Sequence, residues 1–350
     1  MCVAAPRQVF WEMTAGCNLH CGPCRRREAG RQASPAELTT EESKRLIEDL
    51  ASVGQPLLVF GGGEPLWRAD LFELAEYAQA CGLSVALTTN GTLIDAVIAD
   101  RIEQVGFDWV AISLDGADAG THDAFRNLSG AFMRALDGLL RLRLRGLSVQ
   151  IDTTVTRHNF EQLAEMRTLV ERLDADTWRL FTFVPAGCGL QVPEDQRLTG
   201  PQCERVLSWI AEQAVVHQHF IRVACAPQYW RVLARKHLVV PQQLASFRPG
   251  PTKGCLAGTT ICYISPTGDV FPCGYLPIPC GNIRQTSFAA IWNHSSVLAM
   301  IRNPEFLKGK CGWCEFRQTC SGCRARAYAA TGDYLAEEPD CVYEPQALKA

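Results

Sequence analysis

Short apolar runs alternate with longer amphipathic segments over the first half of the chain. Each run is about four to eight residues long and rich in β-branched and aromatic residues, which is typical of buried strands. The runs lie at residues 8–13, 57–60, 84–88, 109–114, 148–155 and 178–183. Segments with apolar positions at helical spacing separate them, at about 40–53, 70–81, 93–105, 131–145 and 160–173. The first of these opens with Thr39 and Glu42 in capping-box spacing.

Strands that alternate with helices form a parallel sheet whose outer face the helices cover. Six such units predict the α/β fold class and a partial (β/α)6 barrel, similar to part of a TIM barrel. Residues that follow the strands are candidates for function, because the carboxyl ends of the strands meet at one rim. We expect three regions: the partial barrel at 1–195, a helical bridge at 196–245, and a Gly- and Pro-rich C-terminal domain at 246–350.

Charge and hydropathy exclude several partners. The chain of 350 residues carries a formal net charge of −3 at pH 7. That charge gives no overall attraction to nucleic acid or to an anionic membrane. No apolar run reaches the roughly 18 residues of a membrane-spanning helix, and the N-terminus lacks the regions of a signal peptide. We therefore expect a cytoplasmic protein that binds no nucleic acid and does not span a membrane.

Cysteine is the unusual residue, with seventeen in the chain. Cytoplasmic thiols stay reduced, so this number predicts metal binding and not a disulfide framework. Three cysteines lie close together at Cys17, Cys21 and Cys24, directly after the first predicted strand. Nine more fall between Cys255 and Cys341. The C-terminal domain has little helical periodicity, so we expect its cysteines and their metal to supply its core.

The first cysteine group, "CNLHCGPC", is one ligand short of the four that close a zinc site or a [4Fe–4S] cluster. Either His20 completes a zinc site, or the group holds a cluster whose fourth iron stays open for a ligand. The spacing Cys17-x3-Cys21-x2-Cys24 resembles the signature of the radical S-adenosylmethionine (radical SAM) superfamily. That resemblance implies the second interpretation.

Accessory motifs occur in the order in which that family has them, each at the end of a predicted strand. They are "GGGEP" at 61–65, "TTNGT" at 88–92 and "SLDG" at 113–116. Glycines let the backbone approach a ligand closely, and a carboxylate accepts a hydrogen bond from an ammonium group. A lone glycine triplet would be only a turn. In this order, the resemblance implies that Gly62, Gly63 and Glu64 hold the amino group of the SAM methionine.

Three more residues are assigned to SAM by the same resemblance. Ser113 and Arg126 would hold the methionine carboxylate and Asn159 the ribose, although an arginine at such a position is often only a solvated charge. The family uses a [4Fe–4S] cluster to cleave SAM reductively to a 5′-deoxyadenosyl radical, which implies a reducing partner such as flavodoxin or ferredoxin. That radical abstracts hydrogen, so the site has to exclude water and hold its substrate close. The sequence assigns no residue to the chemical steps themselves.

The C-terminal cysteines form a second pattern, from "GCLAGTTICYISPTGDVFPC" at 254–273 to "CGWCEFRQTCSGC" at 311–323 and Cys341. It resembles the SPASM extension of radical SAM enzymes, which carries one or two auxiliary [4Fe–4S] clusters, although Cys320 and Cys323 are one residue closer than in several members. By analogy, two interleaved ligand sets are expected: Cys255, Cys262, Cys273 and Cys323, and Cys311, Cys314, Cys320 and Cys341. A zinc ribbon within 311–323 is the alternative, and Cys280 has no assigned place.

Other stretches resemble the tetrapyrrole-processing members of this group. They are "VPAGCG" at 184–189, "CAPQY" at 225–229 and "CSGCRARAYAATGDYLAEEPDC" at 320–341. The resemblance implies an iron-tetrapyrrole substrate and oxidative decarboxylation of the propionates of iron-coproporphyrin III to the vinyl groups of heme b. Deacetylation of didecarboxysiroheme and heme d1 side-chain processing are alternatives. A peptide-modifying SPASM maturase and a non-enzymatic iron–sulfur carrier or scaffold also stay open.

One segment could contribute to binding an anionic macrocycle. Arginine suits carboxylates, and flat aromatic rings suit a macrocycle. Residues 222–237 contain both, namely Arg222, Tyr229, Trp230, Arg231, Arg235 and Lys236. An amphipathic helix with a solvated basic face explains the same residues equally well.

Decarboxylation to a vinyl group also releases one electron, for which an auxiliary cluster is the predicted acceptor or relay.

Overall fold

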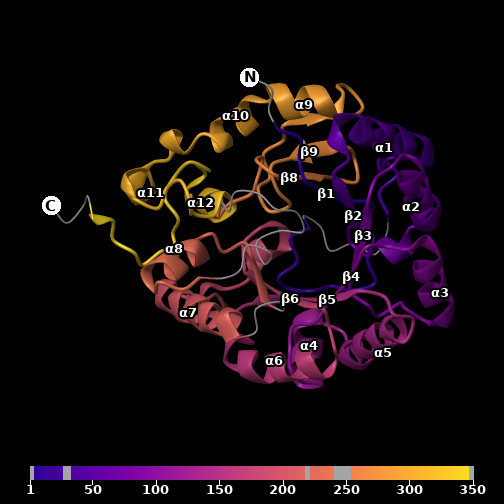
Figure 1. Ribbon diagram of the computed structural model, residues 1–350, viewed down its shortest axis with the longest axis horizontal. Coiled ribbons are helices and arrows are strands. Elements are labelled where there is room, and N and C mark those ends of the chain that lie inside the picture. The colour runs from indigo at the N-terminus through magenta and orange to yellow at the C-terminus, as the bar shows by residue number, and fades with distance from the viewer. Residues whose placement is uncertain (1–3, 27–32, 217–220, 240–253, 347–350) are drawn as a thin grey trace.

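The described residues of this computed structural model, 4–26, 33–216, 221–239 and 254–346, contain a ten-stranded sheet curved around an interior (Figure 1). Its strands in chain order are β1 (Gln8–Glu12), β2 (Leu57–Gly61), β3 (Val85–Thr89), β4 (Val110–Ser113), β5 (Val149–Val155), β6 (Thr177–Thr182), β7 (Ile221–Ala224), β8 (Ile261–Ile264), β9 (Asp269–Phe271) and β10 (Gly281–Asn282). Their order in the sheet is β10-β9-β8-β1-β2-β3-β4-β5-β6-β7.

Helices form an outer ring around these strands (Figure 1). The barrel helices are α1 (Thr40–Gly54), α2 (Leu71–Ala80), α3 (Ala96–Val105), α4 (Ala119–Arg126), α5 (Ala131–Arg143) and α6 (Leu163–Arg172), followed by α7 (Gly200–Val216) and α8 (Gln228–Arg235). The C-terminal helices are α9 (Phe288–His294), α10 (Ser296–Arg302), α11 (Gly309–Trp313) and α12 (Arg324–Thr331). Short 3-10 turns lie at Pro65–Trp67, Phe160–Gln162, Gly187–Gln191, Glu194–Gln196 and Pro304–Phe306.

The strands β1 to β7 are parallel, as the alternation of strands and helices predicts. Successive side chains of a strand point to opposite faces of the sheet. In β1, Val9 and Trp11 are fully buried in the core between the sheet and the helices, whereas Gln8 and Phe10 face the barrel interior. The predicted capping box of α1 is confirmed, since Thr39 and Glu42 each hydrogen-bond the backbone of the other. The predicted α/β partial barrel is therefore confirmed.

Four strands, β7 to β10, lie where the sequence predicts none, and two of them, β7 and β8, lengthen the parallel part of the sheet. Strand β7 interrupts the helical bridge expected at 196–245. It was missed because its four residues are too few to show a strand period in the sequence. Strand β8 pairs with β1 in parallel, with Cys262 opposite Val9. The C-terminal segment thus continues the barrel sheet at one edge, while β7 forms the other edge. Helix α4 was also not predicted; Asp118 caps it by accepting from Thr121 N at 2.9 Å.

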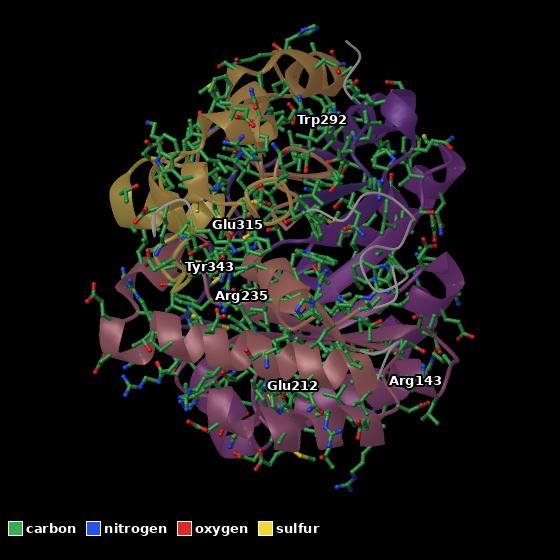
Figure 2. All side chains as sticks on the ribbon, turned by 60° about the vertical axis from the view of Figure 1, so that its left-hand side comes forward. Arg143, Glu212, Arg235, Trp292, Glu315 and Tyr343 are labelled. Atoms are coloured by element: carbon green, nitrogen blue, oxygen red, sulfur yellow. The ribbon has the colours of Figure 1, made fainter. Side chains whose placement is uncertain are left out.

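Side-chain contacts fasten the C-terminal segment to the barrel. Trp292 of α9, labelled in Figure 2, donates from Nε1 to the carbonyl oxygen of Ala4 at 2.9 Å. Arg284 forms a two-pronged ion pair with Glu42 of α1, at 2.8 and 2.9 Å. In the described part of the chain, no helix is long and apolar enough to cross a membrane.

Candidate active site and metal centres

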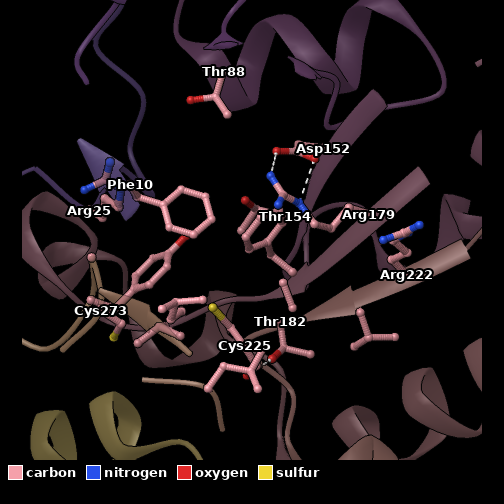
Figure 3. Close-up of a pocket in the computed structure, with 18 of the residues that line it drawn as sticks. Phe10, Arg25, Thr88, Asp152, Thr154, Arg179, Thr182, Arg222, Cys225 and Cys273 are labelled. Carbon is pink, nitrogen blue, oxygen red and sulfur yellow. Dashed lines mark hydrogen bonds and ion pairs between the residues drawn. The ribbon is translucent and has the colours of Figure 1, made fainter. Parts of the chain in front are cut away.

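A cavity of about 700 Å³ runs along the inside of the barrel. Inward-facing strand residues form its walls, among them Phe10, Thr88 and Thr154 (Figure 3). Residues of the C-terminal segment close another side, including Tyr263 of β8 and Tyr275. The cavity therefore has contributions from both halves of the chain. Its position agrees with the expectation that function lies inside the barrel and at its strand ends.

The N-terminal cysteines occupy the loop that follows β1, and Cys21 and Cys24 line the cavity. Cationic and amide groups surround their sulfur atoms. Leu19 N donates to Cys17 Sγ at 3.3 Å, Arg26 Nε to Cys24 Sγ at 3.4 Å, and Arg126 Nη1 to Cys21 Sγ at 3.8 Å. Burial raises the pKa of Cys17 to about 11, and the donor from Leu19 opposes this shift. Such donors suit sulfur ligands that become thiolates when they bind metal.

Gly63 lets the end of β2 pack against the cysteine loop. A Cβ atom on Gly63 would lie 2.0 Å from the carbonyl oxygen of Gly16, which no side chain can tolerate. Gly63 N and Glu64 N donate to the carbonyl oxygens of Thr14 and Gly16, both at 2.8 Å. Gly62, which has a φ of +149°, lines the cavity. The glycines predicted from "GGGEP" therefore position the cysteine loop against β2.

Glu64 lies behind the cavity wall and is fully buried. Its carboxylate accepts from Thr89 Oγ1 at 2.7 Å, from Asn90 N at 2.8 Å and from Leu66 N at 3.2 Å. Burial raises its pKa to about 7, and these three donors oppose the shift. In this geometry Glu64 joins the ends of β2 and β3, and its direct contact with a ligand stays a prediction.

Ser113 and Arg126 both line the cavity, and Arg126 brings its guanidinium to Cys21. Arg126 also pairs with the fully buried Asp115, so it is not the solvated charge that was the alternative. Asn159 does not reach the cavity. Its amide nitrogen donates to the carbonyl oxygens of Asp115 and Thr154, both at 2.9 Å, and its oxygen accepts from the backbone of the same loop. These backbone bonds hold the Asn159 side chain in its loop, and the expected ribose contact stays a prediction.

A row of polar residues crosses four strands of the cavity wall, and two of its members, Asp152 and Arg179, were not predicted from the sequence. The strand registers place Ser113 opposite Asp152, Asp152 opposite Arg179, and Arg179 opposite Arg222. All four line the cavity, and Arg179 binds Asp152 through two hydrogen bonds of 3.0 and 2.5 Å (Figure 3). A charged residue at alternate positions of an otherwise apolar parallel strand is the signal that could have identified them.

Arginine is the dominant charged residue of the cavity wall. Among the described residues that line it are Arg7, Arg25, Arg26, Arg126, Arg179 and Arg222, against the acidic Asp108 and Asp152. The Arg25 guanidinium lies 4.6 Å from the ring centre of Tyr263 and 3.6 Å from the carboxylate of Glu12. The wall therefore combines aromatic surface with an excess of positive charge.

The segment 222–237 divides between two environments. Arg222, Tyr229 and Trp230 line the cavity. The other basic residues do not: Arg231 pairs with Glu204 at 2.5 Å, and Lys236 pairs with Glu212 at 2.7 Å on the surface. Arg235 lies over the ring of Tyr343, 5.1 Å from its centre (Figure 2). Contact of this segment with a substrate stays a prediction, and Arg222, Tyr229 and Trp230 are the residues placed to make it.

Three of the four cysteines expected in the first auxiliary set, Cys255, Cys273 and Cys323, line the cavity. Cys262 does not join them. It lies on β8 between Ile261 and Tyr263, which both face the cavity, so it points to the opposite face and is fully buried in the helix-side core. There the Cys280 thiol is close enough to interact electrostatically with that of Cys262. Its expected grouping with the other three stays a prediction, and the alternation along β8 directs its side chain away from them.

The second expected set comes together around a smaller pocket, which Cys311, Cys314, Cys320 and Cys341 all line. Arg231, Lys310 and Tyr343 line the same pocket. Within the described ranges, no three His, Cys, Asp or Glu side chains close around a single metal ion.

Comparisons with known proteins agree with these features. The radical SAM superfamily model matches residues 11–170, and SPASM, an iron–sulfur cluster-binding domain, matches residues 255–324. The AdoMet-dependent heme synthase of Methanosarcina barkeri is 45% identical over 97% of both chains. The pre-heme d1 synthase of Dinoroseobacter shibae is 34% identical, with 95% of this chain and 85% of that protein covered.

Two further comparisons bear on substrate and fold. The Fe-coproporphyrin III synthase of Methanosarcina barkeri is 32% identical, with 95% of this chain and 87% of that protein covered. Streptococcus suis SuiB bound to S-adenosylmethionine superposes with a TM-score of 0.74 at 16% identity, over 97% of this chain and 78% of that chain. At that identity, the superposition establishes the shared fold.

Proposed function

The chain belongs to the radical SAM superfamily with a SPASM domain, and we propose that it converts two propionate side chains of iron-coproporphyrin III into the vinyl groups of heme b. It is a radical SAM enzyme and uses SAM and [4Fe–4S] clusters. The heme-synthase relative at 45% identity supports the tetrapyrrole substrate. The observation that carries the proposal is the arginine-rich, aromatic cavity between the two groups of cysteines.

The cavity wall has the chemistry that a propionate-bearing macrocycle requires. Arginine forms paired hydrogen bonds to carboxylates, and aromatic rings pack against a flat ring system. On one wall, Arg25 supplies a guanidinium group and Tyr263 an aromatic ring. On another, Arg179 and Arg222 supply two neighbouring guanidinium groups. Asp152 holds Arg179 in place through two hydrogen bonds, which fixes the direction of its remaining donors. We infer that these arginines bind propionates and set which side chain faces the reacting end.

The donor sets fit the clusters that the family uses. Cys17, Cys21 and Cys24 would hold the SAM-binding cluster, with Arg126 and Arg26 close to their sulfur atoms. When bound, these groups supply one-electron cleavage of SAM, hydrogen abstraction and, at the auxiliary clusters, an acceptor for the electron released with CO₂. The chain itself contributes binding and orientation of the substrate within the cavity.

The order of identities separates the tetrapyrrole alternatives. Deacetylation of didecarboxysiroheme gives iron-coproporphyrin III, and the relative named for that product is 32% identical. The relative named for heme d1 processing is 34% identical. Both values lie well below the 45% of the heme synthase. This difference favours propionate decarboxylation over the other two reactions.

The deciding experiment offers the reconstituted, reduced protein SAM together with iron-coproporphyrin III or with didecarboxysiroheme. We expect stepwise loss of two carboxyl groups from iron-coproporphyrin III, with 5′-deoxyadenosine formed in parallel, as read by mass spectrometry. Turnover of didecarboxysiroheme alone would overturn the assignment in favour of deacetylation.

A variant pair tests the substrate contact. Arg222→Gln should weaken iron-coproporphyrin III binding by on the order of 10- to 100-fold, the usual worth of a charged hydrogen bond. SAM affinity should not change, because Arg222 lies on β7, away from the N-terminal cysteine loop. Lys236→Gln removes an exposed charge on the same segment and should leave both affinities unchanged. Equal porphyrin affinity in both variants would contradict the contact.

A further inference from the structure

Four cysteines, and not three, come together at the C-terminal side of the cavity. Cys225 follows directly after β7 and lines the cavity together with Cys255, Cys273 and Cys323. One small apolar cluster contains Cys323, and both Cys225 and Cys273 pack against that cluster. Figure 3 shows Cys225 and Cys273 on the same side of the cavity. A [4Fe–4S] cluster takes four thiolates, and this group supplies that number without Cys262.

Hydrogen bonds fix Cys225 relative to the helix that follows Cys323. Thr182 Oγ1 donates to the carbonyl oxygen of Cys225 at 2.7 Å. Arg326 of α12 donates to that same hydroxyl at 2.9 Å and binds Glu338 at 2.9 Å. Arg326 is buried and joins Glu338 to the Thr182 hydroxyl that holds Cys225. The position of Cys225 is thus fixed relative to α12, which begins directly after Cys323.

The surroundings of the two cysteines differ. Cys225 shares the cavity wall with Cys255, Cys273 and Cys323. Cys262 lies in the helix-side core, and Cys280 packs against that same core. The neighbours of Cys225 are therefore the other candidate ligands.

We propose that Cys225 is the fourth thiolate of the auxiliary cluster held by Cys255, Cys273 and Cys323, and that Cys262 is not a ligand of this cluster. The assignment does not depend on which tetrapyrrole the enzyme uses. It closes the coordination of the cluster with protein ligands, so that no iron of this cluster is left open for substrate.

The proposed ligand set also joins the two edges of the barrel sheet. Cys225 follows β7, which is one edge, whereas Cys255 and Cys273 flank the hairpin of β8 and β9 at the other. The two edges approach closely here, since a Cβ atom on Gly254 would lie 2.7 Å from Cβ of Pro227. A cluster at this place therefore cross-links the open side of the partial barrel beside the cavity.

The test compares two buried cysteines in a background without the N-terminal cluster, Cys17→Ala/Cys21→Ala/Cys24→Ala, so that all remaining iron is auxiliary. Adding Cys225→Ala should remove about one iron per chain, leaving a three-iron cluster with its own electron paramagnetic resonance (EPR) signal, or about four if the cluster is lost. Adding Cys262→Ala should leave the iron, sulfide and EPR signals of the background. Full iron content and an unchanged spectrum in the Cys225→Ala protein would overturn the proposal, as would cluster loss in the Cys262→Ala protein.

Two further variants separate ligation from a folding defect. Cys225→Ser keeps an oxygen donor at nearly the same volume, so the iron content should stay close to that of the background while the EPR signal of the reduced cluster shifts. An unshifted signal contradicts ligation. Cys255→Ala serves as the reference for a lost ligand, and combining it with Cys225→Ala should remove at most the four irons of one cluster. Loss of more than four irons per chain would show that the two cysteines serve different sites and would sink the assignment.

Discussion

The two cysteine regions of this protein are built in different ways. The N-terminal group lies within eight residues of one loop, from Cys17 to Cys24, and the parallel strand β1 presents that loop at the barrel rim. The C-terminal groups draw on segments that are far apart in the chain, from Cys225 to Cys341, and assemble only when β8 joins β1. Local spacing therefore defines the first site, whereas long-range pairing defines the others.

This difference has an energetic consequence. The N-terminal loop is held by the barrel core and by backbone bonds from Gly63 and Glu64. The C-terminal segment has short helices and strands and a core in which cysteines take part. Metal binding to such a segment contributes directly to its folding free energy. Loss of ligands should therefore abolish chemistry at the first site and reduce stability at the others.

The largest effect is expected at the N-terminal group. Replacing Cys17, Cys21 and Cys24 by Ala should abolish formation of 5′-deoxyadenosine, because no other described site combines three thiols with the SAM-binding motifs. Most of the C-terminal iron should remain, since the C-terminal ligand sets contain none of these three cysteines. Chromatography for deoxyadenosine and an iron assay measure both. Continued reductive cleavage of SAM in this variant would contradict the assignment of the site.

Replacing Cys314 and Cys320 of the second auxiliary set should affect product formation more than SAM cleavage. The double variant to Ala should leave SAM cleavage measurable, yet lower decarboxylated product per deoxyadenosine, because the electron released with CO₂ loses its acceptor or relay. Circular dichroism and the EPR signal of the N-terminal cluster serve as controls for folding. An unchanged product ratio without the auxiliary clusters would leave them with a purely structural role.

A substitution of Glu64 tests how strongly SAM binding depends on the position of the β2 and β3 ends. Glu64→Gln replaces one acceptor oxygen by a donor that faces Thr89 or Asn90 N, so the ends of β2 and β3 should shift. We expect SAM affinity to fall by on the order of 1.5–3 kcal/mol, the range for a hydrogen bond to a charged group. Equilibrium titration with SAM measures this loss. Wild-type affinity would show that Glu64 neither contacts SAM nor positions its site.

The smallest effect is expected at the surface contact between the two regions. Arg284→Gln removes the ion pair with Glu42 and should lower the free energy of unfolding by at most about 1 kcal/mol, because the pair is exposed. Arg284 and the Thr39 backbone lower the pKa of Glu42 to about 2. The stabilisation is therefore present at neutral pH and is lost as pH falls from about 4.5 towards 2.

The control for this contact is Arg141→Gln, which removes an exposed pair with Asp137 within one helix. Denaturant unfolding at pH 7 and at lower pH measures both variants. The wild type and Arg284→Gln should converge as the solution becomes acidic. A constant difference across this range would contradict the role assigned to Glu42.

Much of the barrel could be predicted from the sequence. The strand and helix periods located six strands to within about two residues, and the spacing of Cys17, Cys21 and Cys24 identified the first site. These features are local, because side-chain periodicity and ligand spacing within one loop depend on neighbouring residues. The second auxiliary set, Cys311, Cys314, Cys320 and Cys341, also came together as the family resemblance implied.

The tertiary structure alone decided which distant residues share a wall. Cys225 lies 30 residues before Cys255 in the chain, yet it lines the same side of the cavity. Cys262 lies closer in sequence but points to the other face of the sheet. Side chains alternate along a strand, so one step along β8 moves a thiol from the cavity to the helix side. Strand register across β4 to β7 likewise aligned Ser113, Asp152, Arg179 and Arg222, because pairing between strands is set by packing and not by distance along the chain.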